Sequence, residues 1–203
     1  MMGGNTDSDI SVESIVVGSA VPRRDYGALR RLGLWVLKKM QWRAAGHFPD
    51  CPRLVVAIAP HSSNWDFVIG AALLYVLGVR VSFIGKHTLF RGPLGSFMRW
   101  LGGIALDRSR PEGFAETMAA EFARHDQLWL VIAPEGTRRA GAEFKSGFYR
   151  IAQAADVPIL PVYLNFQRRV TGFLPPIEPA ADISAGLAQI RQLLLTHGAR
   201  KAG

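Results

Sequence analysis

The chain has 203 residues, a length that fits one domain with a sizeable hydrophobic core. Hydrophobic residues make up 49% of it, yet no apolar run reaches the ~20 residues that a membrane-spanning helix needs. A single cysteine, Cys51, excludes a disulfide framework and a cysteine-based metal site. The net charge of +8 favours an anionic partner, which could be nucleic acid, a phospholipid or a phosphorylated substrate.

The chain divides into three predicted regions, with no repeat or low-complexity linker between them. Residues 1–25 begin polar and acidic, the reverse of a signal peptide, so we expect a flexible N-terminal segment there. Residues 26–45 are expected to form an amphipathic helix, and residues 46–200 a single folded domain.

The predicted helix at 26–45 combines an apolar stripe with a basic face. Leu32 and Leu37 belong to a set of apolar side chains at helical spacing, whereas lysine and arginine side chains gather on the other side. Trp35 and Trp42 lie one heptad apart at the flank, a pattern that suits a helix lying in a membrane interface. The alternative is an ordinary surface helix packed on the core, and the sequence leaves both interpretations open.

Beyond this helix, apolar runs that predict strands alternate with periodic stretches that predict helices. Continuous apolar runs are typical of strands buried on both faces, as in a parallel sheet. The sequence therefore predicts an α/β fold with a largely parallel central sheet flanked by helices. In chain order, the elements are a strand at 54–59, a helix at 66–77, strands at 81–85 and 104–107, a helix from Pro111, a strand at 128–133, a helix at 147–155, a strand at 158–166 and a helix at 184–197.

Two of the predicted strands end in the same way. The stretches VVAIAPHSS and LVIAPEGT are both apolar runs that end in Ala-Pro and continue with a titratable residue, His61 or Glu135. Open α/β sheets bind ligands in the crevice beyond the carboxyl ends of their strands. If these two strands are parallel neighbours, we expect His61, Asp66, Glu135 and Arg138 to face the same crevice.

His61 and Asp66 are a candidate catalytic base and its orienting carboxylate. A histidine titrates near neutral pH and can take a proton from a hydroxyl, which contributes about 10²–10⁴ in rate. Asp66, in the first turn of the following helix, could hold one ring nitrogen and stabilise the imidazolium. No G-x-S-x-G elbow is present, and Ser62 and Ser63 are too close to the histidine to be obvious nucleophiles. This favours a hydroxyl that belongs to the substrate.

Two other interpretations of His61 and Asp66 stay open at this point. Metal binding would need a third ligand at suitable spacing, and the other histidines lie in unrelated contexts, so no metal is expected. A purely structural role would make Asp66 a helix cap and His61 a loop residue.

Four sequence blocks resemble those of the glycerolipid acyltransferases, whose best-known members are the 1-acylglycerol-3-phosphate O-acyltransferases. HSSNWD has the form H-x4-D, and PEGTR resembles the second signature of that family. GKHTLFRGPLGSFMRWLGGIALDRSR resembles the middle block and VPILPV the fourth. The blocks lie in the family's order over roughly residues 55–165. The chain thus resembles a short bacterial-type member.

This resemblance implies an enzyme of phospholipid biosynthesis, an O-acyltransferase that moves a fatty acyl group to the hydroxyl of a lyso-lipid, foremost 1-acylglycerol-3-phosphate. It implies acyl-CoA or acyl-carrier protein as co-substrate and no further cofactor. It also implies His61 as general base, Asp66 as its partner and an arginine for the acceptor's phosphate. The implied substrate-binding residues are Glu135, Gly136, Thr137 and Arg138, and Lys86, Arg91 and Arg108 are further candidates for headgroup or donor phosphates.

The expected partners are a lyso-lipid acceptor, the acyl donor and an anionic membrane surface, and the expected location is peripheral, at the cytoplasmic face of the cell membrane. Nucleic acid is not expected, because the chain shows no recognised motif for it and its basic residues flank apolar stripes. Two alternatives are an acceptor without phosphate, such as a lyso-amino-acid lipid, and a non-catalytic lipid-binding module at the membrane surface.

Overall fold

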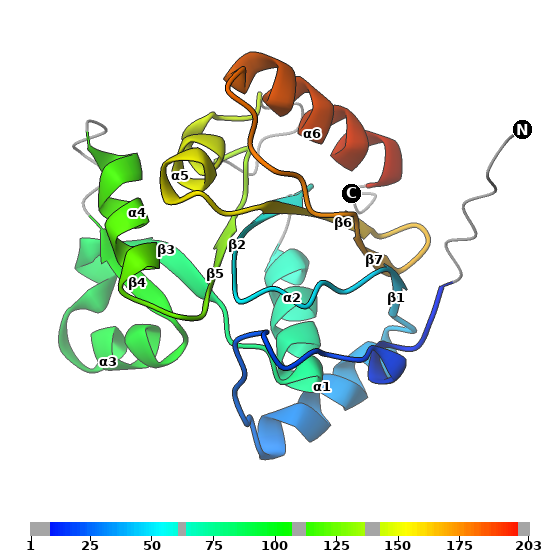
Figure 1. The fold of residues 1–203 in the computed structure, drawn as a ribbon. Coiled ribbons are helices and arrows are strands. Elements are labelled where there is room, and N and C mark those ends of the chain that lie inside the picture. Colours follow the sequence, from blue (N-terminus) through cyan, green and yellow to red (C-terminus); the bar gives the residue numbers. More distant parts are fainter. Residues whose placement is uncertain (1–8, 61–63, 107–112, 137–142, 199–203) are drawn as a thin grey trace, which may run out of the picture.

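The computed structural model describes residues 9–60, 64–106, 113–136 and 143–198, which form one seven-stranded sheet between two layers of helices (Figure 1). The strands are β1 (Arg43–Gly46), β2 (Arg53–Ala59), β3 (Ser82–Lys86), β4 (Gly103–Leu106), β5 (Leu128–Ile132), β6 (Ile159–Asn165) and β7 (Val170–Phe173). Their order in the sheet is β1-β7-β6-β2-β5-β3-β4. Only the β6–β7 pair among these neighbours is antiparallel, which confirms the predicted α/β class with a largely parallel sheet.

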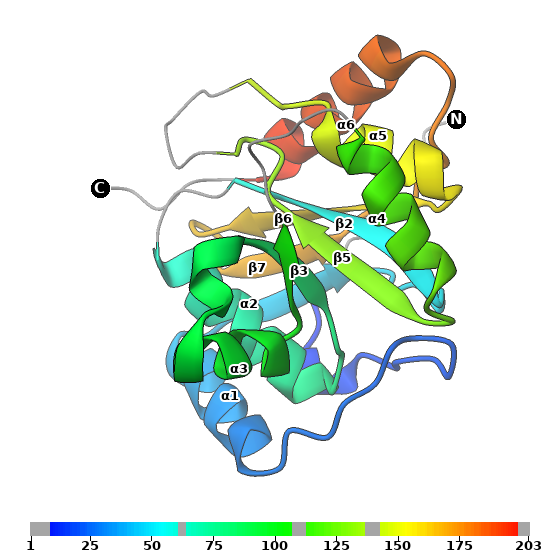
Figure 2. The ribbon, with the colours of Figure 1, turned by 90° about the vertical axis from the view of Figure 1, so that its left-hand side faces the viewer.

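The helices cover both faces of this sheet. They are η1 (Val12–Ser14), α1 (Ala28–Lys39), α2 (Asn64–Leu77), η2 (His87–Phe90), α3 (Gly92–Trp100), α4 (Phe114–Ala123), α5 (Gly147–Ala155) and α6 (Ile183–His197). Helices α1 and α2 lie on one face, and α4, α5 and α6 lie on the other (Figure 2).

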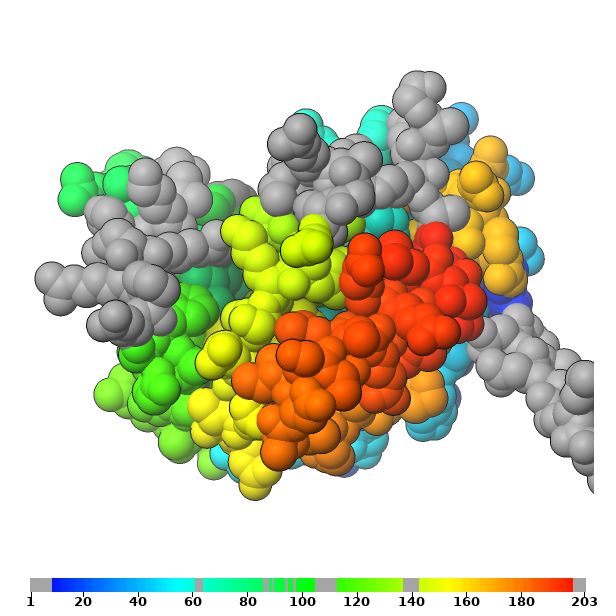
Figure 3. All heavy atoms as spheres, turned by 90° about the horizontal axis from the view of Figure 1, so that it is seen from above, coloured from blue at the N-terminus to red at the C-terminus, as the bar shows by residue number. Residues whose placement is uncertain are grey.

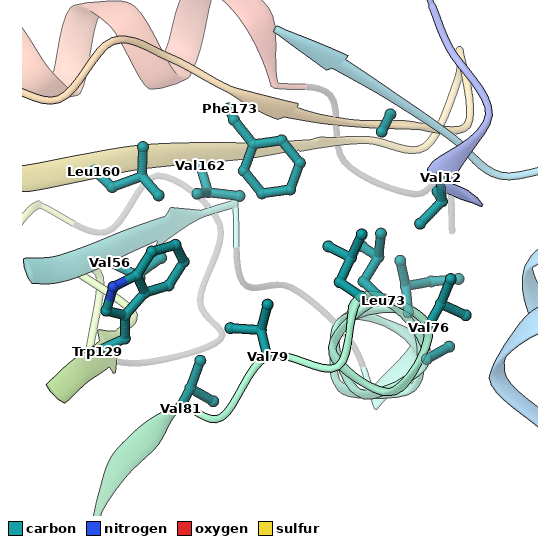
Figure 4. Packing of buried hydrophobic residues seen from close by; sticks show 14 of the residues in the cluster. Val12, Val56, Leu73, Val76, Val79, Val81, Trp129, Leu160, Val162 and Phe173 are labelled. Carbon is teal, nitrogen blue, oxygen red and sulfur yellow. The ribbon is translucent and has the colours of Figure 1, made fainter. Parts of the chain in front are cut away.

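Alternation along the central strand β2 builds a separate hydrophobic core on each face. Leu54 and Val56 point toward α2, whereas Val55 and Ala57 point toward α5, because successive side chains of a strand leave on opposite faces. Figure 4 shows the first of these cores, in which side chains of the sheet and of α2 meet. The labelled residues are Val12, Val56, Leu73, Val76, Val79, Val81, Trp129, Leu160, Val162 and Phe173.

The register of the central strands places two carboxyl ends side by side. β2 pairs in parallel with β5, with Val55 opposite Leu130 and Ala57 opposite Ile132. It pairs in parallel with β6 on its other side. The segments that follow β2 and β5 therefore begin next to each other, at the same edge of the sheet. The strands that end in Ala-Pro, β2 and β5, are therefore parallel neighbours, as the prediction of a shared crevice required.

The chain between residues 26 and 46 is not one continuous helix, in contrast to the sequence prediction. Helix α1 ends at Lys39, and β1 follows and pairs with β7 in parallel, with Ala44 opposite Thr171. The indole Nε1 of Trp42 donates a hydrogen bond to Thr171 Oγ1 at 2.8 Å, and Trp42 is buried. Trp42 therefore belongs to the core and not to a membrane interface. The two partners lie 129 positions apart, so local periodicity could not reveal this pairing.

The segment before α1 also differs from the flexible tail that the sequence suggested. Ile10 forms an isolated bridge with Ala44, and Val12 and Val21 are buried. The backbone N–H of Ala20 donates to the Asp50 carboxylate at 2.8 Å. Apolar side chains that local periodicity did not mark thus hold residues 9–25 against the domain, while the first eight residues lie outside the described chain.

Helix α1 packs on α2 at very short range. A Cβ on Gly33 would lie 2.8 Å from the backbone carbonyl oxygen of Ala72, so only glycine permits this approach. Leu37 is buried in the same contact, whereas Leu32 and Trp35 remain 52% and 63% exposed. The helix therefore uses one face for the core and leaves an apolar outer face in contact with solvent.

The remaining expectations agree with the structure to within a few residues. The structure adds α3 and β7, which the periodicity did not mark. Helix α4 begins at Phe114 after a left-handed Gly113, whereas Pro111, where the sequence placed its start, lies outside the described residues. Among the helices described, none is both long and apolar enough to cross a membrane.

The contact at Gly33 predicts opposite effects of the same substitution in two neighbouring helices. Gly33→Ala should lower the free energy of unfolding by about 1–3 kcal/mol, because the added methyl group forces α1 away from α2. Gly70→Ala in α2, where a Cβ would have no neighbour within 4 Å, should raise it by about 0.5–1 kcal/mol through helix propensity. Chemical denaturation followed by circular dichroism measures both. A stabilised Gly33→Ala variant would contradict the packing described.

Candidate active site

The candidate site lies at the carboxyl edge of β2 and β5. β2 ends at Ala59, and the cis peptide bond that follows leads into the buried Pro60. β5 ends at Ile132 and continues through Ala133 into the buried Pro134. Neighbouring strands of a sheet lie about 4.8 Å apart, so the segments after these two prolines start close together.

Asp66 occupies the first turn of α2 and is the third residue of this helix. Its residue is only 4% exposed. The partial positive charge at the start of a helix suits a carboxylate side chain in this position, and such a carboxylate can hold an imidazolium. His61 precedes this helix in the sequence but lies outside the described residues, so the predicted contact between His61 and Asp66 stays a prediction.

Glu135 and Gly136 form a tight turn directly after β5. Glu135 is only 3% exposed, and Gly136 is exposed with a φ of 61°. The N–H of Gly136 donates to the carbonyl oxygen of Ala133 at 3.1 Å, which closes the turn. This left-handed conformation favours glycine, because any other L-residue is strained there. Thr137 and Arg138, the next two predicted binding residues, lie outside the described residues.

The three cations predicted from the middle block are placed to different extents. Lys86 is the last residue of β3, which pairs in parallel with β5, so its backbone lies at the same carboxyl edge. Arg91 is exposed and directly precedes α3. Arg108 lies outside the described residues. The structure thus brings Asp66, Glu135 and the backbone of Lys86 to one edge of the sheet.

Sequence reasoning missed Lys145, which lies against the turn at Gly136. The N–H of Lys145 donates to the carbonyl oxygen of Pro134 at 2.9 Å. A Cβ on Gly136 would lie 3.1 Å from both Cδ and Cε of Lys145, so the lysine side chain crosses directly over the glycine. Lys145 follows Gly136 by nine positions in the sequence, and the only sequence signal was the position of the lysine shortly before α5.

The C-terminal end of α6 packs against the carboxyl edge of the sheet beside β6. The Asn165 side chain donates through Nδ2 to the carbonyl oxygen of His197 at 2.9 Å, and the His197 ring stacks on Tyr163 with 5.3 Å between centroids. A Cβ on Gly198 would lie 2.9 Å from Pro60 Cδ. Seen from above, α6 lies beside α5 on this face (Figure 3). The sequence had given His197 no relation to the site.

The residues described at this edge are of the types that proton transfer and anion binding require. A buried carboxylate at the start of α2 can orient a base, and a tight glycine turn with a lysine across it can accept an anionic group. Within the described part of the chain, no three His, Cys, Asp or Glu side chains converge in a way that could hold a metal ion.

Comparison with known proteins points to one family. Residues 47–165, more than half of the chain, match the family model described as Acyltransferase. Over 155 residues the chain is 32% identical to the 1-acyl-sn-glycerol-3-phosphate acyltransferase of Salmonella typhimurium, which covers 68% of this chain and 61% of that protein. Over 183 residues it is 29% identical to the human 1-acyl-sn-glycerol-3-phosphate acyltransferase alpha, with 78% of this chain and 63% of that protein covered.

The fold is similar to that of a solved structure. The crystal structure of the 1-acyl-sn-glycerophosphate (LPA) acyltransferase PlsC from Thermotoga maritima superposes with a TM-score of 0.56 over 86% of this chain and 80% of that one. At 17% identity this similarity concerns the fold alone. The alignments with the Salmonella and human proteins span less than two thirds of either relative. From the family match together with the site at the carboxyl edge of β2 and β5, we conclude that the chain belongs to the acyltransferase family.

Proposed function

We propose that this protein is an O-acyltransferase that transfers a fatty acyl group from an acyl thioester to the hydroxyl of a lyso-lipid, most specifically 1-acylglycerol-3-phosphate. The observation that carries this proposal is the parallel pairing of β2 and β5. Because of this pairing, the H-x4-D segment and the Glu-Gly-Thr-Arg segment begin at neighbouring strand ends. Each segment contains one deeply buried carboxylate, Asp66 or Glu135. Family membership and the names of the relatives support the same reaction.

In the proposed mechanism, His61 removes the proton from the acceptor hydroxyl as the oxygen attacks the carbonyl carbon of the thioester. The tetrahedral intermediate then collapses, the carbon–sulfur bond breaks, and the thiolate takes the proton back from the imidazolium. The products are an ester and a free thiol, so no external base is consumed. Asp66 stabilises the imidazolium between the two steps, as the carboxylate of a catalytic triad does.

The acceptor's phosphate is assigned to the turn after β5. Arg138 can hold a phosphate through two parallel hydrogen bonds, and the absence of a side chain at Gly136 lets the backbone come close. Thr137 and Glu135 are assigned to the acceptor's glycerol part, and Lys86, Arg91 and Arg108 to further phosphate contacts of either substrate.

We assign membrane attachment to the face that carries α1 and the start of α2. Arg30 of α1 donates to the carbonyl oxygen of Val76 and Gly33 lies against Ala72, so α1 packs on the C-terminal half of α2. Large apolar side chains of both helices are exposed here, and a lipid acceptor could pass from this face to Asp66 directly. These side chains are Leu32 and Trp35 on α1 and Trp65, Phe67 and Val68 on α2.

The expected location is peripheral, on the cytoplasmic face of the cell membrane. An anionic surface would also attract the basic residues of α1, each of which contributes about 1 kcal/mol near such a surface. Lys38 and Lys39 in the last turn of α1 are both exposed.

The proposed base predicts a specific loss of turnover. His61→Ala should lower kcat by about 10²–10⁴-fold, because the acceptor hydroxyl loses its general base. His125, a partly buried histidine two residues after the end of α4, provides the matched control, and His125→Ala should leave kcat unchanged. Labelled acyl transfer measures kcat, and circular dichroism and vesicle binding verify that both variants fold. Turnover that survives in His61→Ala would reject the mechanism, and a wild type that binds vesicles without any turnover would favour the non-catalytic module.

The acceptor's identity is tested with a panel of lyso-lipids against acyl-CoA and acyl-carrier protein. Arg138→Gln should raise KM about tenfold for acceptors that carry a phosphate, because one charge-assisted interaction is lost, and should leave KM for phosphate-free acceptors unchanged. If the wild type accepts only phosphate-free lyso-lipids, the phosphate role of Arg138 is wrong and the lyso-amino-acid alternative holds.

The membrane face is tested by substitution, because deletion of the N-terminal residues would remove Val12, Leu37 and Trp42 from the core. The double variant Leu32→Ser, Trp35→Ser should weaken partition into anionic vesicles about tenfold or more, since two exposed apolar groups no longer enter the interface.

Leu195→Ser provides the control for this experiment. Leu195 is 58% exposed on α6, on the opposite face of the sheet, so its substitution should have no effect on partition. Equal partition of the double variant and the wild type in a flotation assay would show that α1 serves only as a packing element.

A further inference from the structure

A second binding feature lies on the other face of the sheet, between α4 and α5. These two helices run side by side (Figure 2). A groove of about 790 Å³ opens at the first turns of both helices and continues along α5 as far as Ala154. One wall is formed by Gly113 to Glu116 at the start of α4. The other wall is formed by Lys145 to Gly147 with Arg150 and Gln153 of α5. The mechanism proposed above assigns no role to these residues.

Lys145 connects this groove to the candidate active site. Its side chain lines the groove and also crosses over Gly136, with Nζ 3.3 Å from the position of a Cβ there. Gly136 follows directly after Glu135, at the carboxyl end of β5, and β5 is the neighbour of β2. A ligand that lies in the groove and passes Lys145 therefore reaches the carboxyl end of β5. The carboxyl end of β2, which precedes His61 in the sequence, lies next to it.

The groove combines two cations with apolar and amide surface, and one carboxylate, that of Glu116, lies on the wall formed by α4. Lys145 and Arg150 are both exposed on one wall, and Nε of Arg150 donates to Ser146 Oγ at 3.3 Å, which holds the guanidinium along that wall. Both helices begin at the groove, so their first N–H groups add to the positive potential. Phe114 and Ala115 provide apolar contact, and Gln153 can exchange hydrogen bonds with an amide. A chain of amide and methylene groups that carries a phosphate matches this lining.

We propose that this groove binds the phosphopantetheine arm of the acyl donor, with its phosphate between Lys145 and Arg150. The inference rests on the proposed function, because it presupposes a thioester donor. Acyl-CoA and acyl-carrier protein share this arm, so either donor can use the groove. The thioester end extends past Lys145 and Gly136 to the carboxyl ends of β5 and β2.

This assignment gives the two substrates separate approaches to one reaction centre. The lyso-lipid enters from the face of α1 and α2, where large apolar side chains are exposed, and the donor enters from the face of α4 and α5. The donor is a water-soluble molecule or protein, so its approach from the face that does not contact the membrane is physically consistent. Both substrates can then be bound at the same time, as direct transfer requires.

The test uses charge-neutral variants of the two cations and a matched surface arginine. Lys145→Gln and Arg150→Gln should each raise KM for acyl-CoA about tenfold, because each loses one charge-assisted phosphate contact, with kcat and the KM for the lyso-lipid unchanged. Arg191→Gln, an exposed arginine on α6 outside this groove, should leave all constants as in the wild type. An increase in KM for the lyso-lipid alone would overturn the proposal and place Lys145 in the acceptor site.

Truncated donors locate the phosphate and separate the two possible sources of the arm. With S-acyl-phosphopantetheine the variants should show the same increase in KM as with acyl-CoA, whereas with S-acyl-pantetheine, which lacks the phosphate, wild type and variants should be equal. A KM effect seen with acyl-CoA but lost with acyl-phosphopantetheine would overturn the proposal, because the cations would then bind the nucleotide. Acyl-carrier protein as donor should show the same increase if it uses this groove, and an unchanged KM would restrict the groove to acyl-CoA.

Direct binding distinguishes a failure of this inference from a failure of the proposed function. Fluorescence or calorimetric titration with a non-reactive S-alkyl phosphopantetheine requires no acceptor and no turnover. Binding by the wild type that weakens about tenfold in Lys145→Gln and Arg150→Gln supports the groove even if no lyso-lipid is acylated. Equal binding by wild type and variants overturns the groove even if acyl transfer is observed.

Discussion

The parallel pairing of β2 with β5 is the constraint on which the rest of this molecule depends. It gives the segments after Ala59 and Ile132 a common starting edge, and its register is fixed from both faces of the sheet. Leu54 and Val56 must reach one core while Val55 and Ala57 reach the other, so a slip of one residue would exchange the two sets. The two hydrophobic cores therefore hold the starts of the candidate catalytic segments in position, although none of their side chains takes part in the proposed reaction.

The sheet also separates two surfaces with different chemistry. On the side of α1 and α2, large apolar side chains face solvent and basic residues lie near them, which suits contact with lipid. On the side of α4 and α5, a groove lined by Lys145 and Arg150 suits a phosphate-bearing chain. Each of these two surfaces extends to the carboxyl edge of the sheet, where one of its helices, α2 or α5, has its first turn. In the proposed arrangement, the sheet lies between a lipid-facing layer and a water-facing layer, so that one small domain brings a membrane lipid and a soluble thioester together.

Much of the fold was predictable because its central strands are buried on both faces. Such strands are continuous apolar runs, and β2, β5 and β6 were found from these runs to within about one residue. The edge of the sheet was not predictable in this way. β1 has only four residues, and it exists because β7 pairs with it and because Trp42 bonds to Thr171, contacts between distant parts of the chain. The helix before it was predicted too long for the same reason.

By itself, the sequence determined the α/β class, the two Ala-Pro strand ends and the chemical character of Asp66 and Glu135, because these follow from residue type and from patterns within a few positions. The tertiary structure alone decided that the two strand ends are neighbours, that α1 packs on α2 through Gly33, and that Lys145 lies across Gly136. The physical reason is that strand order and helix docking arise from contacts between residues far apart in the chain. Local periodicity records which face of an element is apolar, but it carries no information about which element covers that face.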